Sequence, residues 1–148
     1  MTKRMFNGEN MNDSQCIFCR IVRKQAHASI VYEDETVLAF IDIRPLSEGH
    51  TLVIPKEHYE TIFEIPEELL AQLHRIVKRV ALAAKKATEA DGISIFQQNG
   101  AAAGQEVFHF HVHVVPRHEG QKLARFGEIS EADRGKMDQL AANIRRSM

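Results

Sequence analysis

The stretch FHFHVHVVPR, residues 108–117, alternates histidine with apolar side chains. Side chains of a β-strand point to opposite faces in turn, so His109, His111 and His113 are predicted to share one face. The apolar residues between them then point into the core. A solvated strand that carries histidines by chance is the plain alternative. Strict alternation against an apolar face argues against that alternative.

Neighbouring imidazoles suit two kinds of chemistry. Histidines two positions apart can bind zinc together. A neutral imidazole is also a good nucleophile towards phosphorus near neutral pH, and imidazoles beside it can stabilise the charged oxygens of the transition state. The spacing alone is compatible with both.

Strand signals lie on both sides of the middle of the chain. β-Branched and aromatic residues predict two strands around a turn at residues 33–35 and another strand at residues 51–54. The segment ISIFQQNG, residues 93–100, predicts a strand that ends in an Asn-Gly turn, and the histidine stretch is predicted to be the last strand.

Two helices are predicted. Apolar residues recur at helical spacing after Pro66, and Asp91 with Gly92 is a suitable stop. A terminal helix is expected from Ser130, with Ser130 and Asp133 as a capping box. The fold class is therefore α+β, a mostly antiparallel five-stranded sheet packed by one long helix, with a C-terminal helix.

Length and composition bound the function. The chain has 148 residues, a length that fits one domain. Its net charge of −1 gives no support for nucleic-acid binding. Polar residues 1–14 are expected to form a flexible arm, and residues 15–148 a single domain with a helical C-terminal extension. No apolar run suggests a membrane span or a secretory signal, so a cytoplasmic location is expected.

Several segments together resemble the histidine triad (HIT) superfamily of nucleotide hydrolases and transferases. They are CIFCRIV, VLAFIDIRPLSEGHTLVIPKEH, QNG and GQEVFHFHVHVVPR, and they occur in family order over about residues 15–118. The resemblance is to the Hint-like, bacterial branch. The galactose-1-phosphate uridylyltransferase branch has Gln at the third triad position, where this chain has His113.

This resemblance implies catalytic roles. His111 would attack the α-phosphate of a nucleotide and form a nucleotidyl-histidine intermediate that water hydrolyses. His113 would contact the phosphate and the leaving-group side. The carbonyl of His109 would orient the His111 ring, and His50 would lie close to the triad.

The resemblance also implies a nucleotide site. Asp42 would accept hydrogen bonds from the ribose hydroxyls, and Asn99 would contact the phosphate. Gln105 and the Val107 N–H lie just before the triad, on the phosphate side. Glu106 stands where Hint proteins usually have a hydroxyl residue that binds the phosphate or the leaving group. The resemblance therefore does not indicate which leaving group this chain recognises. The apolar base cleft would comprise Phe18, Ile21, Phe40 and Ile43, although core packing explains Ile21 and Phe40 equally well.

Cys16 and Cys19 have the spacing of a metal or redox pair. Similarity to zinc-binding bacterial HIT proteins implies a structural zinc site made of Cys16, Cys19, His58 and His109. Two free thiols in a reducing cell are the alternative. The remaining histidines, His27, His74 and His118, are expected at the surface.

The function implied is hydrolysis of purine nucleoside 5′-phosphoramidates, adenosine first, without a catalytic metal or an organic cofactor. The family also implies a homodimer, with the long helix and a strand edge at the interface. Three alternatives stay open: a dinucleoside polyphosphate hydrolase, a slow-turnover nucleotide-binding regulator, and a zinc hydrolase that uses the three histidines as ligands. The sequence does not indicate what the terminal helix does.

Overall fold

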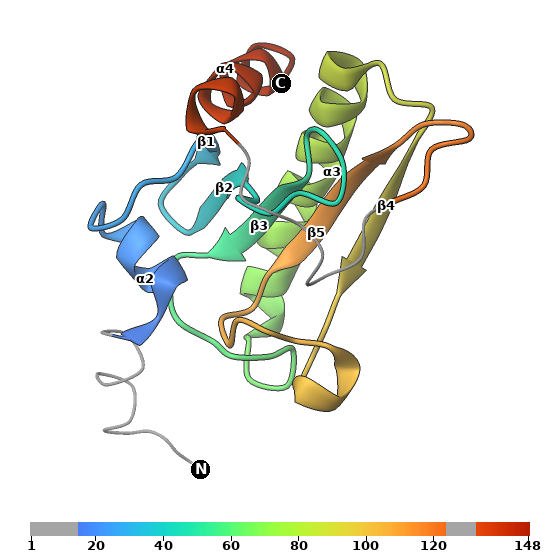
Figure 1. Cartoon of the computed structure of the whole chain (residues 1–148). Helices are drawn as coiled ribbons and strands as arrows, with labels where there is room; N and C mark the ends of the chain where they lie inside the picture. Colours follow the sequence, from blue (N-terminus) through green and yellow to red (C-terminus); the bar gives the residue numbers. More distant parts are fainter. Residues whose placement is uncertain (1–14, 124–132) are drawn as a thin grey trace.

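The computed structural model describes residues 15–123 and 133–148, so the predicted N-terminal arm lies outside the described residues. Its elements are α2 (Ile17–Val22), β1 (Ile30–Glu33), β2 (Val37–Ile41), β3 (Thr51–Pro55), α3 (Glu67–Thr88), β4 (Gly92–Gln97), the 3-10 turn η1 (Ala101–Ala103), β5 (Val112–Arg117) and α4 (Arg134–Arg146). Five strands form one sheet in the order β1-β2-β3-β5-β4, and each neighbouring pair is antiparallel (Figure 1). The predicted α+β fold is confirmed.

The central strands are buried on both faces of the sheet. In β2, Val37, Ala39 and Ile41 pack into the core under α3 and α4. Leu38 and Phe40, which alternate with them, belong to a second apolar cluster on the opposite face, beneath α2. A strand covered on both sides needs apolar residues at every position, which is why VLAFI has no polar residue.

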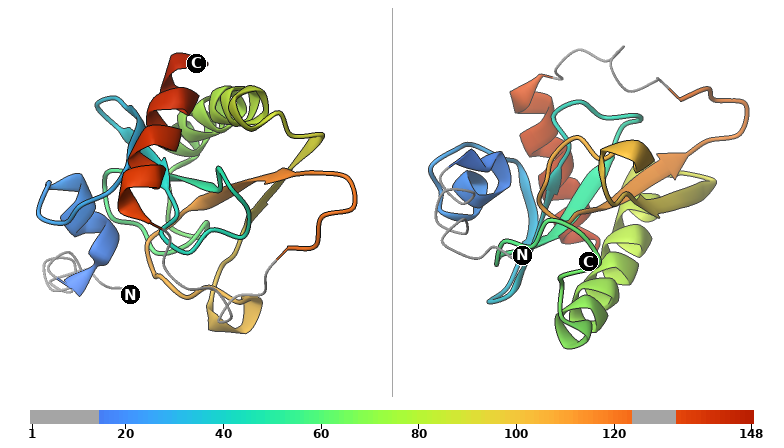
Figure 2. Two further views of the ribbon diagram at one scale, coloured as in Figure 1. Left: turned by 45° about the horizontal axis from the view of Figure 1, so that its top comes forward. Right: turned by 90° about the horizontal axis from the view of Figure 1, so that it is seen from below.

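The long helix α3 covers one face of the sheet (Figures 1 and 2). Pro66 is its N-cap, and Glu67 and Glu68 lie in its first turn. The helix ends at Thr88, before the predicted stop at Asp91-Gly92. Glu89 adopts a left-handed φ of 54° and closes the helix, while the Asp91 N–H bonds to the Arg117 carbonyl and begins the β4–β5 pairing.

The terminal helix also begins later than predicted. Asp133 is the N-cap of α4, and its carboxylate accepts a hydrogen bond from the Lys136 N–H at 3.0 Å. Ser130, the cap residue expected from the sequence, lies outside the described residues. α4 packs against α3 and β1 and buries Met137, Ala141 and Ile144. Within residues 15–123 and 133–148, no helix is long and apolar enough to cross a membrane.

The last strand is shorter than predicted. β5 begins at Val112, so His109 and His111 lie in the segment that leads into it. The Phe110 N–H bonds to the Tyr59 carbonyl at 2.6 Å, in a loop instead of a neighbouring strand. The predicted alternation of faces still holds, because Phe110 and Val112 pack under α3 while the histidines point to the other side.

Candidate active site

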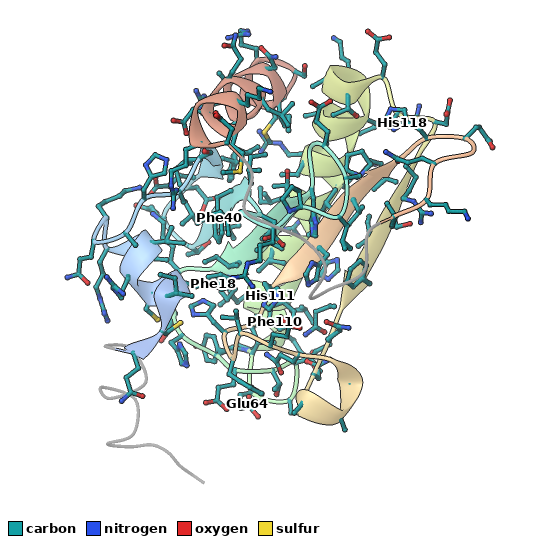
Figure 3. The ribbon with its side chains drawn as sticks, in the orientation of Figure 1. Phe18, Phe40, Glu64, Phe110, His111 and His118 are labelled. Atoms are coloured by element: carbon teal, nitrogen blue, oxygen red, sulfur yellow. The ribbon has the colours of Figure 1, made fainter. Side chains whose placement is uncertain are left out.

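A cavity of about 460 Å³ lies on the face of the sheet opposite α3, beside α2. Figure 3 shows Phe40, Phe18 and His111 in succession across this face. Eight of the residues predicted for catalysis or nucleotide binding line it: Phe18, Ile21, Phe40, Asp42, Ile43, Val107, His111 and His113. The Phe18 ring meets Phe40 edge-on at 5.4 Å and His111 at 5.2 Å between ring centroids, which joins the apolar part of the cavity to the histidines.

Two predicted phosphate-side residues hold the adjoining loops together. The Asn99 side chain accepts from the Ile62 N–H at 2.7 Å and donates to the Gln97 side chain at 2.8 Å. Gln105 accepts from the Gly100 N–H and donates to the Glu60 carbonyl, each at 2.7 Å. In the part of the chain that the structure describes, neither residue lines the cavity.

The His111 ring has a defined tautomer. Its Nδ1 lies 2.7 Å from the His109 carbonyl oxygen, which can only accept, so Nδ1 carries the proton and donates it. In the neutral ring the lone pair is then on Nε2. Burial lowers the pKa of His111 below its usual value of 6.5, and the His109 carbonyl opposes this shift only in part. The ring is therefore neutral at pH 7 and presents Nε2 as a nucleophile.

A chain of hydrogen bonds fixes the neighbouring imidazoles. The Leu46 N–H donates to His50 Nδ1 at 2.9 Å, so neutral His50 carries its proton on Nε2. That proton is donated to His113 Nδ1, also at 2.9 Å, which places the His113 proton on Nε2. Burial lowers the pKa of both rings to about 3, with repulsion by His111 adding to it. His113 is therefore a neutral donor beside His111.

Asp42 brings a carboxylate to the cavity. Its Oδ1 accepts from the Arg44 N–H at 2.9 Å, and its Oδ2 lies 3.6 Å from His50 Nε2. Burial raises its pKa to about 6, despite the Arg44 contacts. At pH 7 the group is mostly ionised and can accept hydrogen bonds from two neighbouring hydroxyl groups.

Sequence reasoning missed Phe96, which supports one of these histidines. Phe96 is the register partner of His113 across β4 and β5, and the two rings stack at 4.3 Å with 11° between their planes. The aromatic residue in ISIFQQNG was a visible signal. The register that places it beside His113 could not be read from the sequence.

Other lining residues were also unexpected. They come from the loop before β1, from the segment after Asp42 and from α4, and they include His27, Ser29, Arg44, Arg134 and Met137. His27 was expected to be an ordinary surface residue. It is half-exposed as expected, but it lies at the cavity, where its Nε2 is 3.3 Å from Asp138 Oδ1. His118 bonds to the Thr88 carbonyl, far from His111 in Figure 3.

The predicted metal ligands are brought together beside this cavity. The ligand atoms of Cys16, Cys19, His58 and His109 all lie within 4.8 Å of one another. Cys16 Sγ is 3.3 Å from His109 Nδ1, and Cys19 Sγ is 3.2 Å from His58 Nδ1. A tetrahedral zinc ion with two sulfur and two nitrogen ligands separates sulfur from nitrogen by about 3.6 Å, so this donor set fits zinc.

The protonation of the cluster also suits a metal. His109 Nε2 donates to the Pro55 carbonyl at 2.8 Å, which leaves the lone pair of neutral His109 on Nδ1, inside the cluster. Cys16 caps α2, and the hydrogen bond from Cys19 lowers its pKa far below that of a free thiol, with His109 and His58 adding to the effect. Zinc binds cysteine as the thiolate and histidine through an unprotonated ring nitrogen, which are the forms present here.

The three alternating histidines do not form one metal site. His109 belongs to the cysteine cluster, whereas His111 donates to a carbonyl. Among the described residues, two groups of side chains are close enough to share an ion, and neither of them includes His111. The geometry therefore gives no support to a zinc hydrolase with His109, His111 and His113 as ligands.

Comparison with known families agrees with this arrangement. Residues 23–120 match the family model described as HIT domain. The chain belongs to the HIT family. Proteins of this family bind nucleotides, and many are nucleotide hydrolases or transferases.

Individual HIT proteins are similar over most of this chain. A HIT-like protein of Methanocaldococcus jannaschii is 44% identical over 131 residues, which are 88% of this chain and 98% of the relative. A solved zinc-bound histidine triad family protein of Mycobacterium smegmatis has a TM-score of 0.81 and 41% identity, covering 91% of this chain and 94% of its own. An adenylylsulfatase of Arabidopsis thaliana is 42% identical over 72% of this chain and 54% of its own length.

Proposed function

We propose that this protein hydrolyses purine nucleoside 5′-phosphoramidates at the α-phosphate through a nucleotidyl-His111 intermediate. One observation carries the proposal. A buried, neutral imidazole has its Nδ1 proton held by a backbone carbonyl and its Nε2 lone pair at a cavity that also contains a carboxylate and aromatic rings. Membership of the HIT family supports the same reaction class.

In the proposed first step, His111 Nε2 attacks the α-phosphorus and the P–N bond to the leaving group breaks. The leaving nitrogen takes up a proton from water and departs as an amine. The His111 ring becomes positively charged, and the carbonyl of His109 stabilises that charge through the Nδ1–H. Water then attacks phosphorus, the bond to Nε2 breaks, and a nucleoside monophosphate is released.

Neighbouring groups supply orientation and charge stabilisation. The Nε2–H of His113 can bind a phosphate oxygen as charge develops on it, since the His111 and His113 ring centroids are 4.9 Å apart. Asp42 would hold the ribose hydroxyls. The Phe18 and Phe40 rings would contact the base.

Zinc is proposed as a structural ion held by Cys16, Cys19, His58 and His109. The fit of the donor set and the zinc-bound structural relative support this. The ion would tie the start of α2 to the segment before β5 and so brace the His109 carbonyl. The His111 reaction does not pass through it.

The test is product release from adenosine and guanosine 5′-phosphoramidates by wild type, His111→Asn and His74→Asn. His74 is an exposed histidine of α3 and serves as the matched control. Turnover by wild type and by the control, with a folded but inactive His111→Asn variant, is expected. Wild-type rates in the His111→Asn variant would overturn the proposed mechanism.

The leaving group is tested with the same proteins. An adenylylsulfatase among the relatives makes adenosine 5′-phosphosulfate a specific second candidate. A diadenosine polyphosphate represents the remaining hydrolase alternative. We expect the highest kcat/KM on the phosphoramidate. Tight nucleotide binding without turnover of any of the three compounds would favour a binding protein.

A homodimer is proposed from the two exposed apolar side chains on the predicted interface elements. Leu82 of α3 is 61% exposed and Ile95 of β4 is 48% exposed. β4 is an edge strand, and such edges are commonly covered by a partner. Light scattering after gel filtration should give twice the chain mass for wild type and the monomer mass for Leu82→Lys.

A further inference from the structure

The terminal helix α4 forms part of the nucleotide cavity of its own chain. Arg134 and Met137, in its first two turns, line the cavity together with residues of the predicted base cleft. The HIT-domain match ends at residue 120, so α4 lies outside the part of the chain that the family model describes.

Specific contacts hold α4 in this position. Ser29, before β1, donates its hydroxyl hydrogen to Asp138 Oδ1 at 2.5 Å, and His27 Nε2 lies 3.3 Å from the same oxygen. Arg145 donates to the Ile30 carbonyl, and Met137 is buried in the core. Arg134 is one turn before Asp138 on the same side of the helix, the side that faces His27 and Ser29.

This end of the cavity is the base end under the proposed function. The α-phosphate must lie at His111, and the Phe18 and Phe40 rings follow it in order. Ile30, which α4 contacts, is the register partner of Phe40. Figure 3 accordingly shows Phe40 between α4 and His111. A nucleotide that starts at His111 and extends past Phe18 and Phe40 reaches α4 with its base.

We propose that α4 is the base-recognition wall of this site and that Arg134 selects a 6-oxopurine, guanine or hypoxanthine, over adenine. The inference rests on the proposed function for the orientation of the nucleotide. A guanidinium group carries only donors. The O6 and N7 edge of a 6-oxopurine offers two acceptors to it, whereas the same edge of adenine offers one acceptor and the N6 donor. Met137 lies against the apolar part of the base.

The experiment measures calorimetric binding of GMP, IMP, AMP and ribose 5-phosphate to the full chain. Wild type, Arg134→Met and Lys136→Met are compared. Lys136 is an exposed cation two positions away that does not line the cavity, so it is the matched control. Wild type and the control should bind GMP and IMP about tenfold more tightly than AMP. Arg134→Met should bind all three nucleotides with the affinity that wild type has for AMP.

Equal affinity of wild type for GMP and AMP would overturn the inference. An equal loss of affinity for all three nucleotides and for ribose 5-phosphate in Arg134→Met would also overturn the inference. Arg134 would then contact the phosphate or the ribose instead of the base. Product binding needs no turnover. A chain that discriminates GMP from AMP but cleaves no phosphoramidate would contradict the proposed function alone, and turnover without base discrimination would contradict the inference alone.

Discussion

His109 and His111 are two residues apart and point to the same side of the chain, yet their rings have different partners. The Nδ1 of His109 faces two cysteine sulfurs and its Nε2 donates to Pro55, so its lone pair lies in a metal-type cluster. The Nδ1 of His111 donates to a carbonyl, so its lone pair lies on Nε2 at the cavity. The acceptor beside each ring, and not the spacing, decides which nitrogen is available for chemistry.

The two regions also share one residue. His109 carries both the ring in the cluster and the carbonyl that orients His111. The cluster should therefore determine folding and the position of that carbonyl, while the histidines at the cavity determine the rate. Substitutions in one region should affect one readout far more than the other.

The largest effect is expected from His111→Asn. Asparagine keeps a donor for the His109 carbonyl but has no nucleophilic lone pair. We expect kcat to fall by about 10³- to 10⁶-fold with little change in melting temperature. Stopped-flow or chromatographic assays give the rate, and calorimetry gives the melting temperature. A variant that keeps a tenth of the wild-type rate would show that another group attacks phosphorus.

A smaller loss of rate is expected from His50→Leu. This change removes the donor to His113 Nδ1, so the His113 proton is no longer fixed on Nε2. We expect kcat to fall by about tenfold to a hundredfold, less than the loss of the nucleophile, while KM changes little. Because His50 is buried, circular dichroism must show that the variant is folded. An unchanged kcat in the folded variant would show that this chain of hydrogen bonds does not contribute to the rate.

Cys19→Ser should lower stability much more than rate, which is the opposite of what is expected for His50→Leu. We expect it to lower the zinc content and to reduce the free energy of unfolding by about 2–5 kcal/mol. The kcat of the folded fraction should change much less than in His50→Leu. Elemental analysis and denaturant unfolding measure these two quantities, with Arg20→Ala, at an exposed position of the same helix, as the control. Loss of turnover in proportion to zinc, in a protein that stays folded, would contradict a purely structural ion.

The smallest effect concerns pH. Burial raises the pKa of Asp42 to about 6, so the carboxylate is charged above that pH and neutral below it. Nucleoside monophosphate binding should therefore weaken as the pH falls through 6. Asp42→Asn should bind about tenfold more weakly at pH 8 and should lose this pH step. If Asp42→Asn shows the same pH step in binding, the step belongs to another titratable group.

Local patterns predicted most of the fold. Helical spacing after Pro66 and the alternation around His111 depend on nearby residues, and both appear in the structure. Element ends were less predictable because they depend on distant partners. β5 starts at Val112 since the preceding backbone bonds to Tyr59, about fifty residues earlier in the chain.

The candidate site was predictable only where the family resemblance covered it. That resemblance implied a common site for Cys16, Cys19, His58 and His109, and the structure places them in one cluster. It did not predict that α4 lines the cavity of its own chain, because the packing of a terminal helix depends on single contacts such as Ser29 with Asp138. The stacking of Phe96 on His113 depends in the same way on strand register.

The proposed mechanism requires that His111 Nε2 becomes covalently attached to a nucleotide. The most direct measurement is mass spectrometry of the protein after mixing with a nucleoside 5′-phosphoramidate and quenching within one turnover, followed by mapping of the modified peptide. The proposed mechanism predicts a transient nucleotidyl adduct on His111 that is absent from His111→Asn. Full turnover by wild type with no adduct at any time, or an adduct on another residue, would contradict it.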